Sequence, residues 1–403
     1  MKRYKQVFLD IKTFPSVFWL VITATLVNQI GNMALIFLVL YTTKHLGYSL
    51  AQGSIVFASF SGSMLLSGFF GGVLIDQLGP VRIMIAALIA NGLALLTFPL
   101  IHNYYICILM CLLWGAISGL YRPASQTLVS YLAPPDLYKI IFSIYRLSLN
   151  LGMSIGPAIG SYLALHSFTA IFIANGIANI LASVILMIGF FGATEFNYKK
   201  GTQTKKIHAF KYLKYDPVAR LFILGMIPIF MVFFQHQSTL SVFIHDDLNL
   251  PLSFYGLIFT INTLIIVFFE LFLTVLIINK SYRFNFILGS LLIIIGFGGM
   301  YFATLKWHII LLVVAWTFGE MILLPSATSY IAEIAPKAQR GVYMSMYSTS
   351  SSFGLLLGPW CGALVMQQFG SGYLWAACGL WGMISLLMFT KMKEPQRETI
   401  VTS

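Results

Sequence analysis

Six ionisable side chains lie inside long apolar stretches of the sequence, where a charge is costly. Ionisable residues are rare in apolar segments of this length, and they mark proton, ion or substrate pathways. The six are Arg122, Arg146, Glu270, Glu320, Glu333 and the titratable His236. They are therefore the first candidates for chemistry.

Glu320 is the strongest candidate for reversible proton binding. At a rise of about 1.5 Å per helical residue, it lies roughly 16 Å inside its apolar stretch, near the middle. Burial raises the pKa of a carboxyl group and a nearby cation lowers it. A glutamate whose neighbours change can therefore bind a proton and release it, and Glu270 is the next candidate for this role.

Structural roles remain open for the other acids. Glu270 could pair with Arg146 or Arg122, all three lying in the same third of the apolar layer. Glu333 is near the end of its stretch and could be a partner of a basic residue in the following loop. The candidate partners in that loop are Lys337 and Arg340.

Several uncharged polar residues have two interpretations. Asn150 is four residues after Arg146, so the two share a helix face. His236 stands between glutamines near one end of its stretch, which favours a packing or rim role over proton transfer. Asn28, Gln29 and Asn32 could line a substrate cavity or simply join helices, and His236 is a further candidate for that cavity. Asn150 and Asn262 are candidates for the transport pathway.

Composition identifies the surroundings of these side chains. Of 403 residues, 59% are apolar and 9% are charged, whereas a soluble domain has roughly 25% charged residues. The solvent must therefore be lipid. The net charge of +12 does not indicate nucleic acid, because the basic residues stand in short loops. The four cysteines lie in apolar runs and are interpreted as buried hydrophobes, with no metal site.

The expected fold is an all-α membrane protein with twelve transmembrane helices in two pseudo-symmetric six-helix bundles. A span needs about 20 mostly apolar residues. Twelve such stretches occur, near 15–41, 51–75, 83–101, 105–131, 140–165, 170–194, 219–243, 253–278, 285–304, 309–333, 342–367 and 373–390. The sequence thus predicts an N-terminal bundle (1–194), a basic cytoplasmic linker (195–218) and a C-terminal bundle with a short tail (219–403).

Basic residues predict the orientation. Counting the loops alternately, 20 of the 24 Lys and Arg residues fall on the side of the two termini, and only Lys44 and Lys306 fall on the other. Cytoplasmic loops carry the excess of basic residues. Both termini are therefore expected in the cytoplasm, with the chain in the inner (cytoplasmic) membrane.

The two halves repeat with one constant offset of 202 residues. Trp114 corresponds to Trp316, and Tyr145 to Tyr347. The clearest matches are Gly152, Gly156, Pro157 and Gly160 with Gly354, Gly358, Pro359 and Gly362. Glycines four apart let two helices approach closely, and the proline bends the helix. Repeated halves place a substrate site between them, near the bilayer midplane.

Three signatures resemble the major facilitator superfamily over nearly the whole chain. The segment 72–82, with Gly72, Asp76, Gly79 and Arg82, resembles its loop motif G-x-L-a-D-r-x-G-r-k. The segment 152–161 resembles the antiporter motif G-x-x-x-G-P-x-x-G-G, with serine in place of the last glycine. Further short segments resemble those of the proton-coupled multidrug efflux branch. They are 121–125, 146–152, and 255–256 followed by Asn262.

This chain departs from the family pattern at the loop motif. Gln77 and Pro80 stand where the family usually has basic residues, and Tyr131 stands where it usually has an aspartate. An unpaired, partly buried charge is costly, so basic and acidic partners are expected to disappear together. The resemblance implies that Asp76 caps the eleventh span in one gate state.

The implied function is secondary transport by alternating access, and the protein is not expected to be an enzyme. Proton-driven efflux of small amphipathic compounds is the first interpretation. The alternative is a specific exporter or importer of one metabolite, peptide or siderophore, and a membrane enzyme or scramblase is less favoured. The expected partners are the lipid bilayer, protons and a small-molecule substrate. No cofactor and no nucleic acid are expected, and the protein is expected to be a monomer.

Overall fold

The computed structural model describes residues 11–190 and 216–395, and these residues form helices and no strands. Most of the predicted linker lies outside them. The first half forms α2 (Ser16–Gly31), α3 (Ala34–Lys44), α4 (Leu50–Leu78), α5 (Pro80–Thr97), α6 (Tyr104–Tyr131), α7 (Tyr138–His166) and α8 (Phe168–Phe190). The second half forms α10 (Pro217–Phe233), α11 (Thr239–Val242), α12 (Leu252–Ile277), α13 (Tyr282–Gly298), α14 (Lys306–Ile334), α15 (Arg340–Phe369) and α16 (Ser371–Thr390).

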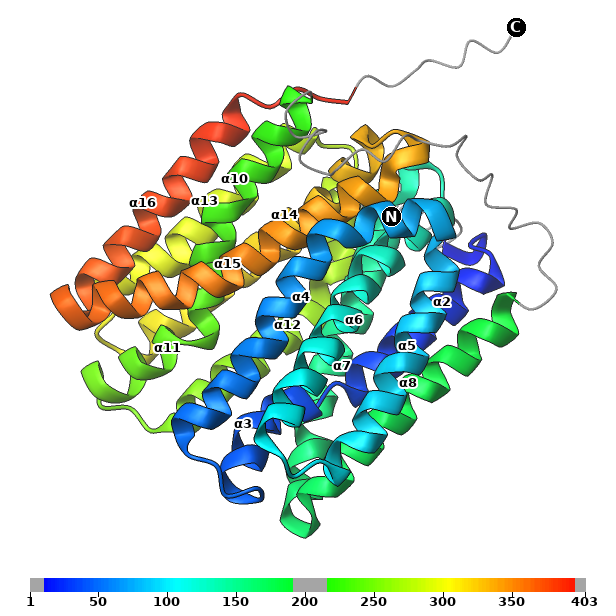
Figure 1. Ribbon diagram of the computed structural model, residues 1–403. Helices are drawn as coiled ribbons and strands as arrows, with labels where there is room; N and C mark the ends of the chain where they lie inside the picture. The colour runs from blue at the N-terminus through cyan, green and yellow to red at the C-terminus, as the bar shows by residue number, and fades with distance from the viewer. Residues whose placement is uncertain (1–10, 191–215, 396–403) are drawn as a thin grey trace, which may run out of the picture. The chain divides into compact units, whose positions relative to one another are not determined.

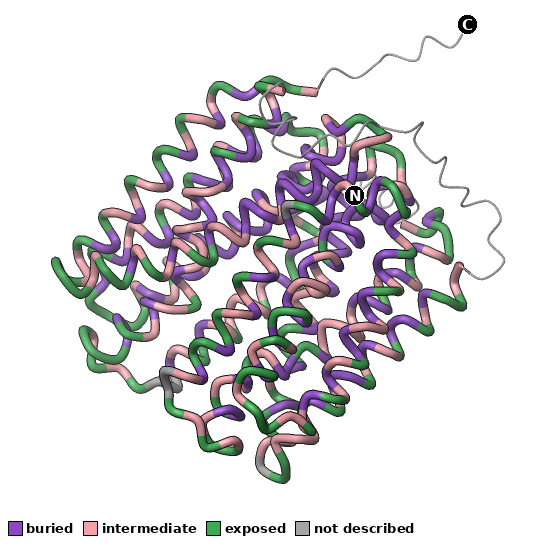
Figure 2. Tube along the Cα trace, in the orientation of Figure 1, coloured by how far each residue is buried: buried purple, intermediate pink, exposed green. Residues whose placement is uncertain are grey.

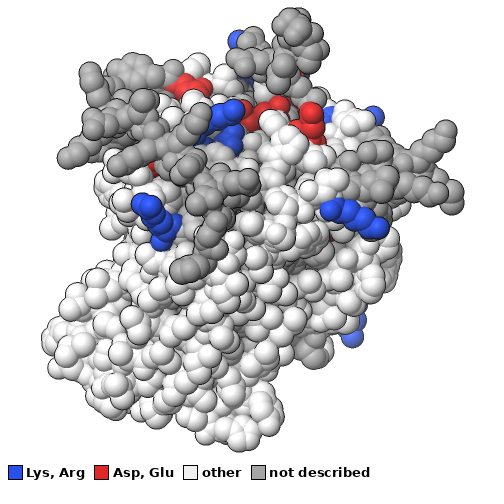
Figure 3. Space-filling model, turned by 90° about the vertical axis from the view of Figure 1, so that its right-hand side faces the viewer, with Lys and Arg blue, Asp and Glu red and all other residues white. Residues whose placement is uncertain are grey.

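Helices form at all twelve predicted stretches. Within residues 11–190 and 216–395, ten helical segments are long and apolar enough to cross a membrane, and the two parts of α4, bent by 56°, would make an eleventh. The remaining stretch is α7, a helix of 29 residues that carries Lys139 and Arg146. On the face drawn in Figure 3, uncharged side chains cover most of the surface. The all-helical membrane fold is confirmed.

The internal repeat extends to the helix boundaries. α4 and α12 begin at Leu50 and Leu252, and α6 and α14 begin at Tyr104 and Lys306. Both pairs of starting residues are 202 apart, and the same offset separates the starts of α5 and α13 and of α7 and α15. The sequence repeat is therefore a repeat of structure.

Local sequence explains several of these helix starts. The Asp216 carboxylate accepts hydrogen bonds from the N–H groups of Val218 and Ala219, and Pro217 occupies the first helical position of α10. Asn103 caps α6 and Ser281 caps α13 in the same way. Such side chains replace the acceptors that the first turn of a helix lacks.

The first span of each half is broken. Gly31 ends α2 and Ala34 begins α3, while α10 continues as a 3-10 turn, η3 (Phe234–Gln237), before α11. At the first break the Asn32 N–H donates to the Gln29 carbonyl, and the Ala34 N–H donates to the side chain of Asn175 on α8. A side chain of a neighbouring helix thus completes the interrupted backbone bonding, as a membrane interior requires.

By their contacts, the residues form two compact units. One comprises Met1–Ala209 with Lys337–Thr349, and the other Phe210–Pro336 with Ser350–Ser403. The start of α15, which the sequence places in the C-terminal bundle, thus belongs to the first unit by its contacts. Within the second unit, α13 lies beside α14 and α16, and α10 lies beside α16 (Figure 1).

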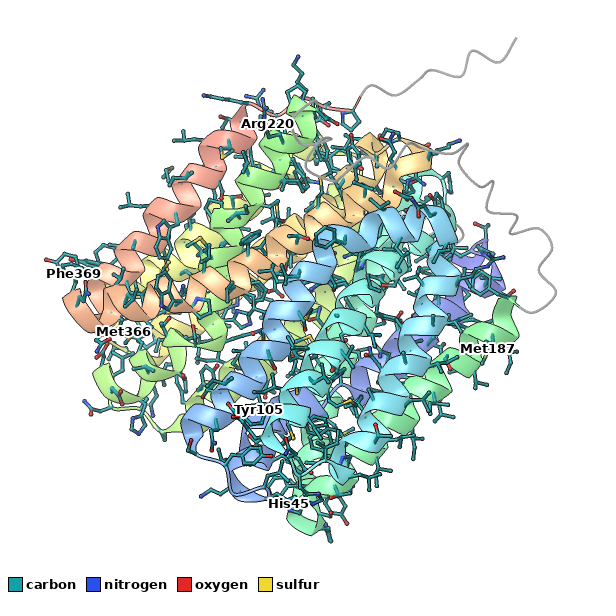
Figure 4. All side chains as sticks on the ribbon, viewed as in Figure 1. His45, Tyr105, Met187, Arg220, Met366 and Phe369 are labelled. Atoms are coloured by element: carbon teal, nitrogen blue, oxygen red, sulfur yellow. The ribbon has the colours of Figure 1, made fainter. Side chains whose placement is uncertain are left out.

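Burial is greatest along α14, where most residues from Gly319 to Ala332 are buried (Figure 2). Exposed apolar side chains such as Tyr105, Phe369 and Leu387 suit contact with lipid. In Figure 4, Arg220 lies at one end of the second unit, and Met366 and Phe369 lie at the other. Which of these ends faces the cytoplasm remains a prediction.

Candidate functional site

The side chain of Glu320 lies at the centre of a polar cluster in the second unit. Glu320 is only 4% exposed and stands midway along α14. The Asn262 side-chain amide, on α12, donates to the Glu320 Oε1 atom at 3.5 Å and to the Thr317 Oγ1 atom at 3.0 Å. The cluster therefore joins α12 to α14 through polar groups at the depth predicted for a coupling acid.

Thr317 sets the direction of the Asn262 amide. The Thr317 hydroxyl donates its single proton to the Val313 carbonyl at 2.6 Å. Its oxygen can therefore only accept from Asn262, which turns the NH2 group of Asn262 toward the carboxylate. Thr317 thus holds the Asn262 amide in the orientation in which it donates to the Glu320 carboxylate.

His236 belongs to the same region of the second unit. It lies in η3, is partly buried, and its Nδ1 atom is 2.5 Å from the Phe233 carbonyl oxygen. Its ring packs against Phe259 of α12 at 5.6 Å between centroids, and Phe259 stands three residues before Asn262, which donates to Glu320. The sequence favoured a packing or rim role and gave no sign of this proximity.

The other two acids of the second unit have different surroundings. Glu270 on α12 is completely buried, and its backbone carbonyl accepts a hydrogen bond from Thr274. Glu333 accepts a hydrogen bond from the Tyr282 hydroxyl at 2.7 Å, which ties α14 to α13. Its pairing with Lys337 or Arg340, and that of Glu270 with Arg146 or Arg122, remain predictions.

The first unit holds the two arginines of the spans. Arg122 is exposed although the following residues of α6 are buried, whereas Arg146 on α7 is 9% exposed. A guanidinium is poorly tolerated in lipid, so we infer that Arg122 faces water. Asn150 donates to the Arg146 carbonyl at 3.1 Å, as their spacing predicts.

Most of the polar residues of the first span join helices. The Asn28 side chain donates to the Asn179 side chain of α8 at 2.5 Å. Gln29 lies against Gly152 of α7. Asn32, in the break between α2 and α3, is exposed, and its role in a substrate cavity remains a prediction.

The glycine stripe of α7 packs against the break of the first span. A Cβ atom at Gly152 would meet Gln29 and Ile30, one at Gly156 would meet the Ile30 carbonyl oxygen at 2.7 Å, and one at Gly160 would meet Met33. At Gly152 and Gly156 the atoms met include the backbone of Ile30, and at Gly160 they are side-chain atoms of Phe37 and Met33, so a larger residue would have to displace them. The stripe therefore holds the broken segment of span one in place.

The glycine stripe of α15 does the same in the second unit. Cβ atoms at Gly354 and Gly358 would meet Phe230 and Met231 of α10, and one at Gly362 would meet Gln235. Buried Gln235 donates to the Met231 carbonyl at 3.1 Å and to the Gly358 carbonyl at 2.6 Å. The predicted motif thus forms equivalent contacts in both halves, and a glutamine seals the second break.

Asp76, in the loop motif, caps the start of α15 within the first unit. Its two carboxylate oxygens accept hydrogen bonds from the N–H groups of Gly341 and Val342 at 2.7 and 3.0 Å. A Cβ atom at Gly72 would meet Val342 and Gly341, so Gly72 permits this approach. Gly79 has φ +88°, which suits the tight link to α5, and Arg82 is exposed.

Arg340 is held by aromatic rings, a contact that the spacing of these residues in the sequence does not predict. It is 7% exposed, and its guanidinium carbon lies 4.9 Å from the ring centre of Tyr131 and 5.8 Å from that of Tyr138. The Tyr131 hydroxyl donates to the Lys337 carbonyl at 3.0 Å. Tyr131, at the place of the usual aspartate, thus keeps a contact with a cation.

Two repeated helical units with polar clusters inside apolar spans define a polytopic membrane transporter. The family model of the Major Facilitator Superfamily matches residues 21–322 and 237–402. The chain belongs to this superfamily, as the three motifs predicted, and no enzymatic role is indicated.

Relatives and solved structures agree with this assignment. The MFS-type transporter YqjV of Bacillus subtilis (strain 168) is 23% identical over 90% of this chain and 89% of its own length. A Na(+), Li(+), K(+)/H(+) antiporter of Planococcus maritimus is 21% identical over 88% and 90%. A bacterial homologue of the iron transporter ferroportin has a TM-score of 0.77 at 16% identity, over 93% of this chain and 98% of its own. This last likeness is one of fold.

Proposed function

We propose that the protein is a proton-driven antiporter that expels small amphipathic compounds across the cytoplasmic membrane, with both termini in the cytoplasm. The observation that carries the proposal is the Glu320 carboxylate, 4% exposed at the middle of α14 and hydrogen-bonded by Asn262. An acid at this depth is a proton or cation site by default.

Proton coupling needs an acid whose surroundings differ between two states. Glu320 has a donor in Asn262, and a cation or a change of hydration beside it would alter its affinity for protons. Aromatic side chains around the cluster, Phe233 and Phe259 among them, offer an apolar surface for an amphipathic molecule. Both features support a site shared by protons and substrate.

Alternating access needs a contact that forms in one state and breaks in another. The two hydrogen bonds from α15 to Asp76 meet this need, because a helix N-terminus attracts a carboxylate. The role of Asp76 in this proposal is to stabilise one state of the gate.

A second candidate is the exchange of alkali cations for protons. The antiporter of Planococcus maritimus carries this activity in its name. The Glu320 carboxylate, the Thr317 hydroxyl and the carbonyl of a rotated Asn262 amide would together offer the oxygen ligands that hard cations prefer. The same pocket would then bind a metal cation and a proton in turn.

Transport in proteoliposomes with an imposed proton gradient decides between these functions. The panel should hold neutral, cationic and anionic amphipathic dyes, Na+, K+ and a set of metabolites. Gradient-dependent movement of one or more dyes supports efflux of amphipathic compounds, and movement of Na+ or K+ alone supports the second candidate. Transport whose rate does not depend on the proton gradient, or transport of a single metabolite only, would contradict the proposal.

The proposed orientation has its own test. In a variant without native cysteines, a cysteine at position 202 should react with an impermeant thiol reagent only after lysis, and one at position 43 should react in intact cells. The reverse pattern would overturn the orientation and leave the fold intact.

A further inference from the structure

A hydrogen bond fixes one ring nitrogen of His236, and the other ring nitrogen can accept a proton. The Phe233 carbonyl, 2.5 Å from Nδ1, can only accept a hydrogen bond, so Nδ1 carries a proton. In the neutral ring, Nε2 is then the basic nitrogen. The Tyr255 hydroxyl donates to the His236 carbonyl at 2.9 Å and fixes the backbone as well.

The groups around this imidazole are mostly apolar rings. Phe233 and Phe234 come from α10 and η3, and Phe259 comes from α12. Of the titratable groups near it, Tyr255 donates to its backbone carbonyl, and Glu320 of α14 accepts from Asn262, three residues along α12 from the Phe259 ring that packs on His236. Among the described residues, Glu320 is thus the acid that α12 places nearest along its length to His236.

The order of residues along α12 places His236 on one side of Glu320. Phe259 contacts the His236 ring, and Asn262, three residues further along α12, contacts Glu320. Three residues correspond to a rise of about 4.5 Å. Since α12 begins at the outer side in the proposed orientation, His236 lies nearer the outer surface than Glu320.

We propose that Nε2 of His236 passes protons between the outer side and the Glu320 carboxylate, an inference that rests on the proposed proton coupling. A proton arriving from outside binds Nε2 and gives an imidazolium. In the next step the Nε2–H bond breaks and an O–H bond forms on Glu320. The ring returns to neutrality as the carboxylate becomes a carboxylic acid, so the pair's net charge is unchanged by the transfer.

The variant His236→Asn separates this relay from a packing role. The asparagine amide can still donate to the Phe233 carbonyl, but nothing replaces Nε2. The matched control is His245→Asn, because His245 is an exposed histidine in the following turn, bonded to Asp246. The second variant, His236→Gln, places an amide that does not titrate near the position of Nε2.

Time-resolved infrared spectroscopy can follow Glu320 without any substrate. Oriented proteoliposomes receive protons from a photolysed caged proton on the outer side, and the carboxylic-acid band lost in Glu320→Gln reports protonation of Glu320. We expect His236→Asn and His236→Gln to slow the rise of this band at least tenfold with its final amplitude kept. Added imidazole should restore the rate in His236→Asn, and His245→Asn should behave as the wild type.

Each outcome has a distinct meaning. An unchanged rate in both His236 variants, or a slow rate that imidazole leaves unchanged, would overturn the relay and leave Glu320 as the coupling acid. If Glu320→Gln removes no band, Glu320 does not titrate, and the proposed function itself fails at this residue.

Discussion

The two halves of the chain share the same helical repeat, but they differ clearly in the residues around Glu320 and its equivalent position. In the second half Asn262, Thr317 and Glu320 form a polar cluster, and His236 lies near it. The residues 202 positions earlier are Phe60, Gly115, Ser118 and Ala34. A Cβ atom at Gly115 would collide with the Phe60 carbonyl and the Ser63 hydroxyl. The first half therefore packs tightly in this region, whereas the second half has the titratable groups Glu320 and His236 there.

This difference shows how a repeated fold can hold a buried acid in one half only. Glycine lets α4 and α6 approach closely in the first half, while threonine and asparagine keep α12 and α14 joined by hydrogen bonds. At the end of the second span the asymmetry is reversed, because Asp76 of the first half corresponds to Ile278. The proposed proton site and the proposed gate residue Asp76 thus lie in different halves of the sequence.

The largest effect is expected at the acid that only one half carries. Glu320→Gln resembles the permanently protonated state, so transport against a gradient should fall to the passive leak. Counterflow of substrate needs no net proton movement and should survive in part. Glu320→Asp should keep some pH dependence with a shifted midpoint, measured in proteoliposomes over a range of pH.

A neutral and a cationic substrate measured together control this result. If Glu320 only attracts a cation, Glu320→Gln weakens cation transport and leaves the neutral compound fully driven by protons. That outcome would rule out Glu320 as the coupling acid and favour Glu270, the other deeply buried acid of the same unit.

Exchanging the residues of the two halves should have the next largest effect. Gly115→Thr introduces the side chain of the second half into a space filled by Phe60, and overpacking of this kind costs about 1–3 kcal/mol. Thermal unfolding in detergent should show the loss. Thr317→Ser, which keeps the hydroxyl, should be close to the wild type in both stability and transport. Equal stability of Gly115→Thr and wild type would show that the halves differ less in packing than their contacts indicate.

Features that depend on residues close together in the sequence could be predicted, whereas most contacts between distant residues could not. The helices, the constant offset and the glycine stripes follow from local pattern, and the structure has them. Asp76 at the start of α15 followed from the family motif. The proximity of His236 to Glu320 did not, because it depends on the 3-10 turn that ends α10. The ring of Tyr131 over Arg340 joins residues whose spacing carries no signal, so their pairing needed the fold.

A smaller effect is expected at the gate contact of the first half. Asp76→Asn leaves one acceptor for two N–H groups of α15, and an unsatisfied buried donor costs about 1–3 kcal/mol. We expect normal amounts of protein in the membrane and slower turnover, because one gate state loses stability. The control is Asp247→Asn at an exposed aspartate. Unchanged transport would show that the motif has lost its gating role here, and absence of the protein would indicate a folding role.

The smallest effect is expected at Tyr131, whose ring contacts Arg340 at the start of α15. Tyr131→Phe keeps the ring and loses only the hydrogen bond to Lys337, so turnover should change little. Tyr131→Leu also removes the cation–π contact, which is worth about 0.5–2 kcal/mol. Turnover should therefore fall further, in the direction of Asp76→Asn. If turnover of Tyr131→Phe fell as far as that of Tyr131→Leu, the hydroxyl rather than the ring would be the important group.

Tyr131→Asp tests whether aromatic rings replace an ion pair at this gate. An aspartate here would restore the residue usual in the family and could pair with Arg340. Salt screens ion pairs that water reaches, and Tyr131 is only partly buried. Turnover of Tyr131→Asp should therefore depend on ionic strength more than that of the wild type, which a salt series in proteoliposomes measures. Identical salt dependence in the two proteins would mean that Arg340 contributes through packing alone. Asp76 would then be the one charged residue of the loop motif with a gating role, and the second half has no equivalent of it.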